Sequence, residues 1–217
     1  MTHHHDDLDV ATLHTEAFWD ERYGSSDQVW SGRPNQRLVE NVTGRAPGTA
    51  LDIGCGEGGD SIWLAGEGWT VTAVDVSGVA LERAARHAVA VGPEVVARIT
   101  WRREDLREWA PAPESYDLVS EQFLHLPSAL RIRQHERFAA AVRPGGMLLV
   151  VGHHPVDNHT MQRPHPADLF FTAEEEAARL SPLQWDVSAT TATRPWHDPD
   201  GNPVTISDAV VRAVRRG

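Results

Sequence analysis

The chain has 217 residues, with 31 Asp and Glu against 20 Arg and no Lys, for a formal charge of −11 with its 12 histidines neutral. A surface this acidic repels phosphate, so the composition argues against binding to nucleic acid or to an anionic membrane. No apolar run reaches the roughly 18 residues that span a bilayer, and the polar, acidic start is unlike a secretory signal. We therefore expect a cytoplasmic globular protein, and its single cysteine, Cys55, fits a reducing compartment.

Short apolar runs alternate with amphipathic stretches along the chain, a pattern typical of an α/β fold. Two helices are expected first, over residues 10–23 and 34–42, the second with Pro34 in its first turn, where the missing N–H costs least. Strands are expected at residues 50–53, 70–75, 99–103, 116–120 and 147–152. Helices are expected between them, at residues 61–65, from Ser77 to about residue 91, and from Pro127 or Ser128 to the Arg-Pro-Gly-Gly of residues 143–146.

The last quarter of the chain has a different pattern. Thr172 and Glu175 have the spacing of a capping box before a short helix. Residues 184–194 and 204–214 then form two strand-like runs, with a dense group of turn formers at 198–203 between them. The whole pattern predicts a Rossmann-like, doubly wound, mostly parallel sheet with a C-terminal antiparallel hairpin and N-terminal cap helices.

The most informative segment is the glycine-rich run Leu-Asp-Ile-Gly-Cys-Gly-Glu-Gly-Gly-Asp at residues 51–60, which leads from a strand into a helix. Its glycines fit the dinucleotide pattern G-x-G-x-x-G, with Asp75 about 20 residues further on, where a ribose-binding acid is expected. The acids Asp52, Glu57 and Asp60 would repel a pyrophosphate, however. They favour a cationic ligand that carries a nucleoside, such as the sulfonium S-adenosylmethionine.

Five motifs follow one another in the order found in class I S-adenosylmethionine-dependent methyltransferases, which residues 19–152 resemble. They are the Asp-Ile-Gly-Cys-Gly-Glu-Gly loop, residues 71–75 with their terminal acid, Arg-Glu-Asp-Leu at 103–106, Tyr-Asp-Leu-Val at 116–119, and Arg-Pro-Gly-Gly at 143–146. The resemblance implies S-adenosylmethionine as cofactor and S-adenosylhomocysteine as product. It also implies one domain over residues 1–217, with a cap at 1–45, a cofactor-binding core at 48–152, and a substrate loop and hairpin at 153–217.

The resemblance assigns roles to individual cofactor-binding residues. It implies that Asp75 accepts from both ribose hydroxyls, that Asp105 meets the adenine amino group, and that Val76 and Leu106 sandwich the adenine ring. The methionine half is assigned to Asp52, Gly54, Cys55, Gly56 and Gly58. The chemistry agrees, because a vicinal diol and an exocyclic amine both donate to carboxylates. Asp75 as a helix cap and Asp105 as a turn residue remain alternatives, and for Asp117 we expect a structural role.

The N-terminal stretch, with Phe-Trp-Asp-Glu-Arg-Tyr at 18–23 and Trp-Ser-Gly-Arg-Pro-Asn at 30–35, is similar to the cap of thiopurine and tellurite-resistance methyltransferases. This similarity implies that Trp30 packs near the cofactor and that Arg33 or Asn35 lies near its methionine end. The alternative is that Trp19 and Trp30 only anchor the cap to the domain.

Acceptor chemistry is expected where the fourth and fifth strands end. Glu121 is the candidate for steering the substrate or the cofactor's ammonium group, and His125, His153 and His154 are candidate general bases. The spacing of the histidines, including His159 and His165, is poor for a metal, so we predict no metal site. The segment at 121–124 also lacks the Asn-Pro-Pro-Tyr type of signature that some amine-methylating enzymes carry.

The sequence thus predicts an enzyme that transfers a methyl group from S-adenosylmethionine to a small-molecule acceptor with a sulfur, selenium, tellurium, oxygen or nitrogen nucleophile. We expect no nucleic-acid or membrane partner. The alternatives are a non-catalytic S-adenosylmethionine-binding sensor or partner subunit and, after it, a dehydrogenase. The identity of the acceptor and the oligomeric state do not follow from the sequence.

Overall fold

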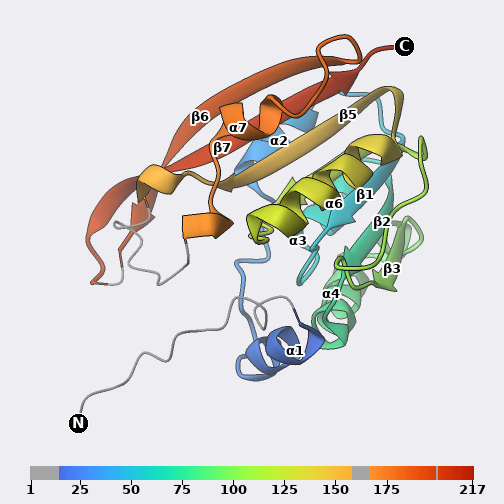
Figure 1. Ribbon diagram of the computed structural model, residues 1–217. Helices are drawn as coiled ribbons and strands as arrows, with labels where there is room; N and C mark the ends of the chain where they lie inside the picture. The colour runs from blue at the N-terminus through green and yellow to red at the C-terminus, as the bar shows by residue number, and fades with distance from the viewer. Residues whose placement is uncertain (1–14, 158–166, 199) are drawn as a thin grey trace.

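The computed structural model describes residues 15–157, 167–198 and 200–217, and a seven-stranded sheet is its centre (Figure 1). The strands are β1 (Thr49–Ile53), β2 (Thr70–Asp75), β3 (Ile99–Arg103), β4 (Tyr116–Gln122), β5 (Val142–His153), β6 (Trp185–His197) and β7 (Pro203–Arg215). Their order is β3-β2-β1-β4-β5-β7-β6, parallel from β3 to β5 and antiparallel at β7 and β6. The predicted fold class is confirmed, and the inserted antiparallel β7 differs from the 3-2-1-4-5-6 order of dinucleotide-binding domains.

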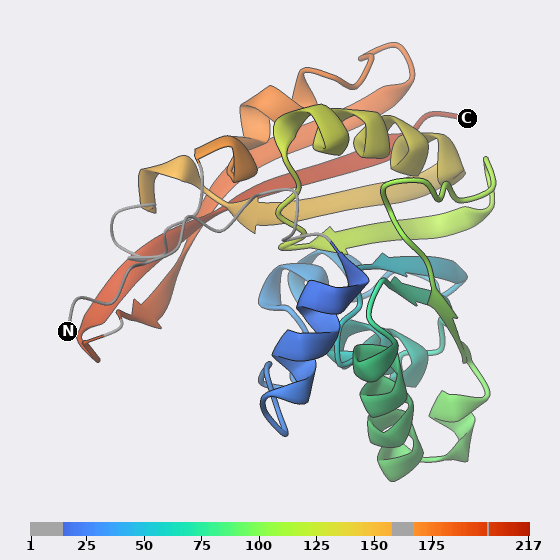
Figure 2. The ribbon, with the colours of Figure 1, turned by 60° about the horizontal axis from the view of Figure 1, so that its bottom comes forward.

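Helices cover both faces of the sheet (Figure 2). They are α1 (Glu16–Gly24), α2 (Gln36–Val42), α3 (Gly59–Gly66), α4 (Gly78–Val91), α5 (Pro93–Val96), α6 (Ser128–Ala141) and α7 (Ala173–Ala177), with 3₁₀ turns at Pro155–Asp157 and Ala167–Leu169. α2, α3 and α4 pack on one face, and α6 and α7 on the other. None of the helices in these described stretches is long and apolar enough to cross a membrane.

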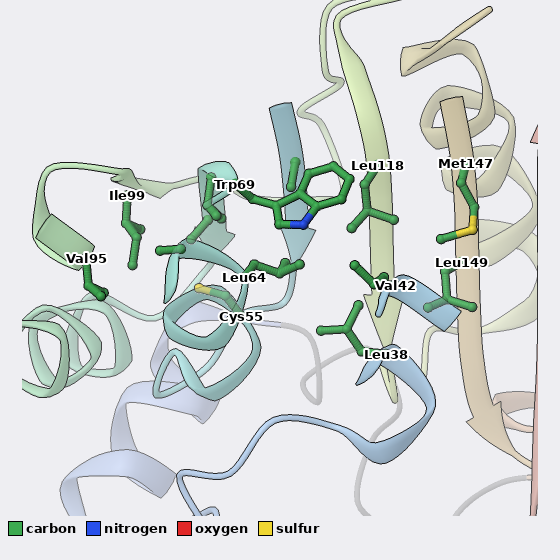
Figure 3. Packing of buried hydrophobic residues seen from close by; sticks show 14 of the residues in the cluster. Leu38, Val42, Cys55, Leu64, Trp69, Val95, Ile99, Leu118, Met147 and Leu149 are labelled. Atoms are coloured by element: carbon green, nitrogen blue, oxygen red, sulfur yellow. The ribbon is translucent and has the colours of Figure 1, made fainter. Parts of the chain in front are cut away.

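The strands divide their side chains between two cores, because successive residues of a strand point to opposite faces. Leu118 and Leu149 pack with Leu38 and Leu64 on the α2 and α3 face (Figure 3). The neighbouring residues Val119, Leu148 and Val150 pack with Phe138 and Phe171 on the α6 and α7 face. Burial on both faces explains why these strands appear in the sequence as continuous apolar runs.

Local capping signals are confirmed at two helices and corrected at a third. The Ser77 hydroxyl accepts from Ala80 N–H at 3.1 Å and caps α4, and the capping box of Thr172 and Glu175 is formed at α7. α2 begins at Gln36 rather than at Pro34, because the Asn35 side chain accepts from Arg37 N–H at 2.9 Å and acts as the N-cap.

Other predicted boundaries differ from the structure. The helix expected from residue 10 begins at Glu16, capped by Thr15, and residues 10–14 lie outside the described part. α6 ends at Ala141, not at the Arg-Pro-Gly-Gly of 143–146, because Val142 already pairs with Tyr116 of β4. A register shift follows, and regular pairing resumes at Leu118 with Met147. The short helix α5 was not predicted from the sequence.

The sheet brings the candidate residues to one edge. β1, β2, β4 and β5 all end there, because parallel strands have their carboxyl ends on the same side. The antiparallel β7 places Asp208 opposite His153 at the same edge, and β6 adds Arg194, which pairs with Ile206.

Candidate active site

The glycine loop after β1 turns tightly by means of left-handed backbone conformations. The backbone φ angles of Gly54, Gly56 and Gly58 are +67°, +52° and +84°, values that residues other than glycine rarely adopt. The N–H groups of Gly54 and Cys55 donate to the Val74 carbonyl at 2.9 and 3.0 Å, and Gly58 N–H donates to the Cys55 carbonyl at 2.9 Å. Because these donors are used inside the protein, the loop does not offer them to a phosphate.

Asp75, the terminal acid of β2, is buried against this loop. Its carboxylate accepts from Gly56 N–H and from Ser77 N–H, both at 2.9 Å, and burial raises its pKa despite these bonds. A carboxylate oxygen can accept two hydrogen bonds, so each oxygen of Asp75 keeps capacity for a further donor. Asp75 therefore holds the glycine loop in shape, and its contact with a ribose stays a prediction.

Asp52, Asp60 and Asp75 form an acidic cluster around the loop, and in the described residues none of them is paired with a cation. Burial and the charge of Asp60 raise the pKa of Asp52 to about 8, although Ser61 Oγ donates to it at 2.5 Å. Burial raises the pKa of Asp60 to about 6, although Asn35 N–H donates to it at 2.5 Å. Uncompensated buried carboxylates are costly, so the cluster fits the cationic methionine half of S-adenosylmethionine.

Glu57 requires a correction. Its carboxylate accepts from the N–H groups of Val29 and Trp30, at 2.7 Å in the latter case, and pairs with Arg83 Nη1 at 2.5 Å. Burial raises the pKa of Glu57, but the hydrogen bonds from Arg83 and from the cap backbone outweigh it and lower the pKa. Glu57 is thus neutralised and fastens the cap to the loop, and the argument against a pyrophosphate rests on Asp52 and Asp60.

Two cap side chains lie over Gly56. Trp30 Nε1 donates to the Tyr23 hydroxyl at 2.9 Å, and a Cβ on Gly56 would lie 2.9 Å from that hydroxyl and 3.3 Å from Trp30 Nε1. Tyr23 is buried, and burial together with the charge of Asp75 raises its pKa. The sequence motif contained Tyr23, but the residue was not predicted as a site residue.

Arg33 approaches the loop through its backbone. A Cβ at Gly59 would lie 2.9 Å from the Arg33 carbonyl oxygen, so only glycine allows this approach.

Cys55 is buried within the loop. Burial, and after it the charge of Asp75, raises the pKa of Cys55 well above the ordinary value. A thiol with a raised pKa is a poor nucleophile, which agrees with a packing role for Cys55.

The residues predicted for the adenine are partly engaged within the protein. Asp105 accepts from Arg107 N–H at 2.9 Å and pairs with its guanidinium, which lowers the pKa of Asp105. Leu106 is buried and packs in one core cluster with Val74, and Val76 is half-buried. The contacts of Asp105, Leu106 and Val76 with adenine stay predictions.

Past the end of β4, four rings gather into what we call the aromatic–imidazole cluster, made of Phe123, His125, His153 and Phe170. The centroids of Phe123 and His153 are 4.6 Å apart, and His125 stacks on His153 at 4.8 Å. Phe123 has φ of +56°, an uncommon value for a residue with a side chain. A Cβ at Gly54 would lie 3.2 Å from Leu124 Cδ1, so the segment after β4 directly adjoins the glycine loop.

The three candidate bases differ in their surroundings. His154 Nδ1 accepts from Val156 N–H at 3.1 Å, and His125 Nε2 faces His153 N–H at 3.5 Å. His153 is buried, and its Nδ1 lies 4.0 Å from Asp208 Oδ1. Asp208 thus lies on the Nδ1 side of the His153 ring. His159 and His165 lie outside the described residues.

Glu121 is fully buried and faces α6 rather than open space. Its carboxylate lies 3.0 Å from His135 Nε2, while His135 Nδ1 lies 2.8 Å from Glu176, which also pairs with Arg131 at 2.9 Å. Burial lowers the pKa of His135, but the charges of Glu121 and Glu176 outweigh it and raise the pKa to about 9. The cofactor or substrate contact of Glu121 stays a prediction. His135 and Glu176 were not predicted, and nothing in their 41-residue separation signals the contact.

Asp117 lies away from this edge. Asp117 accepts from Thr49 N–H at 2.7 Å and pairs with Arg143 at the opposite end of the sheet, which confirms its structural role.

One cavity of about 340 Å³ lies between α6 and α7, and another of about 350 Å³ lies beneath the cap beside Glu57 and His87.

Residues 50–146 match a family model described as "Methyltransferase domain". Residues 50–146, less than half of the chain, are therefore assigned to the class I S-adenosylmethionine-dependent methyltransferase domain. S-adenosylmethionine is the cofactor of this family. Glycine N-methyltransferase of Oryctolagus cuniculus is 35% identical over 122 residues, which are 50% of this chain and 41% of that protein. The chain thus spans less than half the length of the curated relatives that it matches first.

Solved structures of methyltransferase fold are similar over most of the chain. One, reported as "Conversion of a Disulfide Bond into a Thioacetal Group during Echinomycin Biosynthesis", has a TM-score of 0.73 and 20% identity and covers 93% of this chain and 91% of its own. TehB from Haemophilus influenzae has a TM-score of 0.68 and 18% identity and covers 93% of this chain and 67% of its own. At these identities, the likeness shows the fold alone.

Proposed function

We propose that this chain transfers a methyl group from S-adenosylmethionine to a small-molecule acceptor bound at the aromatic–imidazole cluster. The observation that carries the proposal is the acidic cluster of Asp52, Asp60 and Asp75 around a glycine loop that directly adjoins the ends of β4 and β5. When bound, S-adenosylmethionine would supply an electrophilic methyl group on a sulfonium centre.

On the cofactor side, Asp75 would accept from the ribose hydroxyls, while Asp52 and Asp60 would offset the positive charge of the methionine half. Charge-assisted hydrogen bonds to buried carboxylates are the strong ones, so this cluster would supply much of the affinity. Tyr23 and Trp30 would shield the loop from water, since they already lie over Gly56.

On the acceptor side, His153 would act as the general base, because it is buried within the aromatic–imidazole cluster at the end of β5 and Asp208 faces its Nδ1. A thiolate or another anionic nucleophile would need no base. In either case the lone pair of the acceptor would form the bond to the methyl carbon while the bond from that carbon to the sulfonium sulfur breaks and its electron pair stays on sulfur, which leaves S-adenosylhomocysteine. Alignment of the two groups supplies most of the rate.

Calorimetry with S-adenosylhomocysteine and with NAD tests the cofactor half of the proposal. We expect binding of S-adenosylhomocysteine and none of NAD, and tight NAD binding would overturn the proposal. Formation of S-adenosylhomocysteine is then measured with thiols, chalcogen oxyanions, phenols and amines.

Turnover of the variant His153→Ala distinguishes an enzyme from a protein that only binds S-adenosylmethionine. We expect turnover to fall about 100-fold or more for an acceptor that must lose a proton, with cofactor affinity unchanged. Cofactor binding without turnover of any acceptor class would favour the non-catalytic S-adenosylmethionine-binding module instead.

A further inference from the structure

Arg194 of β6 has an accessible cationic edge beside the aromatic–imidazole cluster. Its guanidinium carbon lies 5.5 Å from the centroid of Phe123 and 5.3 Å from that of Trp196, so the planar group is held between rings. Only Nε is engaged, with Asp208 at 3.0 Å. Among the described residues no acceptor lies within hydrogen-bond distance of the two terminal nitrogens, and neither is sealed from solvent.

Two arginines and two carboxylates balance one another in charge around Arg194, but among the described residues the terminal donors of Arg194 have no hydrogen-bond partner. Asp208, which is almost completely buried, is shared between Arg194 and Arg37. Arg37 has two further partners, Glu40 at 3.0 Å and the Thr193 carbonyl at 2.9 Å, so its guanidinium is largely satisfied. Arg194 has no second carboxylate, and its terminal nitrogens form a pair of parallel donors, the arrangement that suits a carboxylate or another oxyanion.

These unused donors of Arg194 lie beside the predicted acceptor site. Phe123, on which Arg194 stacks, also contacts His153 and is followed by Leu124 at the glycine loop. The carboxyl edge of the sheet thus has acids without cations at the cofactor end and an arginine with free donors at the acceptor end.

We propose that the methyl acceptor carries an anionic group, a carboxylate or similar oxyanion on an apolar or aromatic body, and that Arg194 binds this group. The inference rests on the proposed function and names the substrate class of the same site. Arg194 anchors the anion, while the rings of Phe123 and His153 contact the body of the acceptor and leave its nucleophile directed toward the glycine loop.

Matched pairs of anionic and neutral compounds test the proposal by binding alone: benzoate with benzamide, 4-(methylthio)benzoate with its amide, and indole-3-acetate with indole-3-acetamide. Calorimetry at about 0.15 M salt, with and without saturating S-adenosylhomocysteine, measures each dissociation constant. In at least one pair we expect the anion to bind about 10-fold tighter or more, since a hydrogen bond to a charged group contributes about 1.5–3 kcal/mol. Arg194→Gln should reduce that preference to about 2-fold, and Arg194→Lys should retain part of it.

Two controls separate anion recognition from a structural effect. Arg216→Gln removes one exposed positive charge at the other end of the same hairpin and should leave the preference unchanged. Thermal unfolding of Arg194→Gln is the second control, because a loss of preference in a variant that unfolds at the wild-type temperature supports direct recognition.

The outcomes distinguish this inference from the proposed function. A wild-type protein without anion preference in any pair, or an Arg194→Gln variant that keeps the preference, overturns the inference whatever the cofactor does. Failure to bind S-adenosylhomocysteine overturns the proposed function, while the titrations without it still report on Arg194.

Discussion

The two halves of the carboxyl edge treat buried charge in opposite ways. Around the glycine loop, Asp52, Asp60 and Asp75 accept hydrogen bonds from neutral donors and have no cation partner in the described part of the chain. Beyond β4, three buried acids have charged partners: Glu121 and Glu176 pair with His135, and Asp208 pairs with two arginines. The comparison indicates that the paired acids stabilise the fold, whereas the unpaired acids around the glycine loop indicate where a charged ligand binds.

The largest expected effect lies in the paired half. Glu176→Gln would leave Arg131 and His135 as buried cations with one carboxylate fewer, so we expect the free energy of unfolding to fall by about 3–5 kcal/mol. Chemical denaturation at pH 7 measures it. Glu174→Gln, in the same helix but exposed, should change stability by less than about 0.5 kcal/mol. Equal stability of wild type and Glu176→Gln would contradict an architectural role for this ion-pair network.

The second effect lies in the unpaired half. Asp75→Ala should weaken S-adenosylmethionine binding by about 2–4 kcal/mol, because two charge-assisted hydrogen bonds to the ribose would be lost. Calorimetry on the folded variant measures it. Asp117→Ala, at the opposite end of the sheet, is the matched control: it should lower stability without changing cofactor affinity.

The acidic cluster also predicts a pH dependence. Because the pKa values of Asp52 and Asp60 are raised to about 8 and about 6, these groups hold protons over part of the range from pH 6 to 8. A bound cation favours the carboxylate form and lowers both pKa values, so binding releases protons and affinity increases with pH. We expect S-adenosylmethionine to bind at least about 10-fold tighter at pH 8 than at pH 6.

Titrations in buffers of different ionisation enthalpy count the protons released. The variant Asp52→Asn should remove most of the pH dependence while leaving the fold in place. An affinity that is flat from pH 6 to 8 in the wild type would place the cofactor's charge away from this cluster.

The smallest expected effect concerns Asp105. This acid is predicted to bind the cofactor, but it is paired with Arg107 and partly exposed. Asp105→Asn should weaken cofactor binding by about 1 kcal/mol or less, since Arg107 and water already share the carboxylate. Arg107→Gln should free the carboxylate and leave affinity equal or slightly higher. A loss of more than about 100-fold in Asp105→Asn would show that adenine recognition depends on this residue far more than its present partners suggest.

The sequence predicted features that depend on local chemistry. The strand pattern, the N-cap Ser77 and the capping box at Thr172 all follow from residues a few positions apart, and the structure confirms them. The predicted start of α2 at Pro34 was wrong for a local reason. The Asn35 side chain accepts from Arg37 N–H and caps the helix, so the helix begins at Gln36.

Contacts between distant segments could not be predicted. Glu57 was expected to repel an anion, but Arg83, 26 residues away, neutralises it. Glu121 was expected near the substrate, and only the packing of α6 and α7 shows that His135 and Glu176 surround it. The contact of Arg194 with Asp208 likewise requires the hairpin to be folded.

The single cysteine offers a way to observe the site in motion. Cys55 is buried in the middle of the glycine loop, and its pKa is raised well above that of a free thiol, so a disulfide reagent can react with it only when the loop opens. Because the chain has no other thiol, the labelling rate reports opening of this one segment. Comparing that rate with and without S-adenosylhomocysteine would give the free energy by which a ligand holds the loop closed, with no engineered probe.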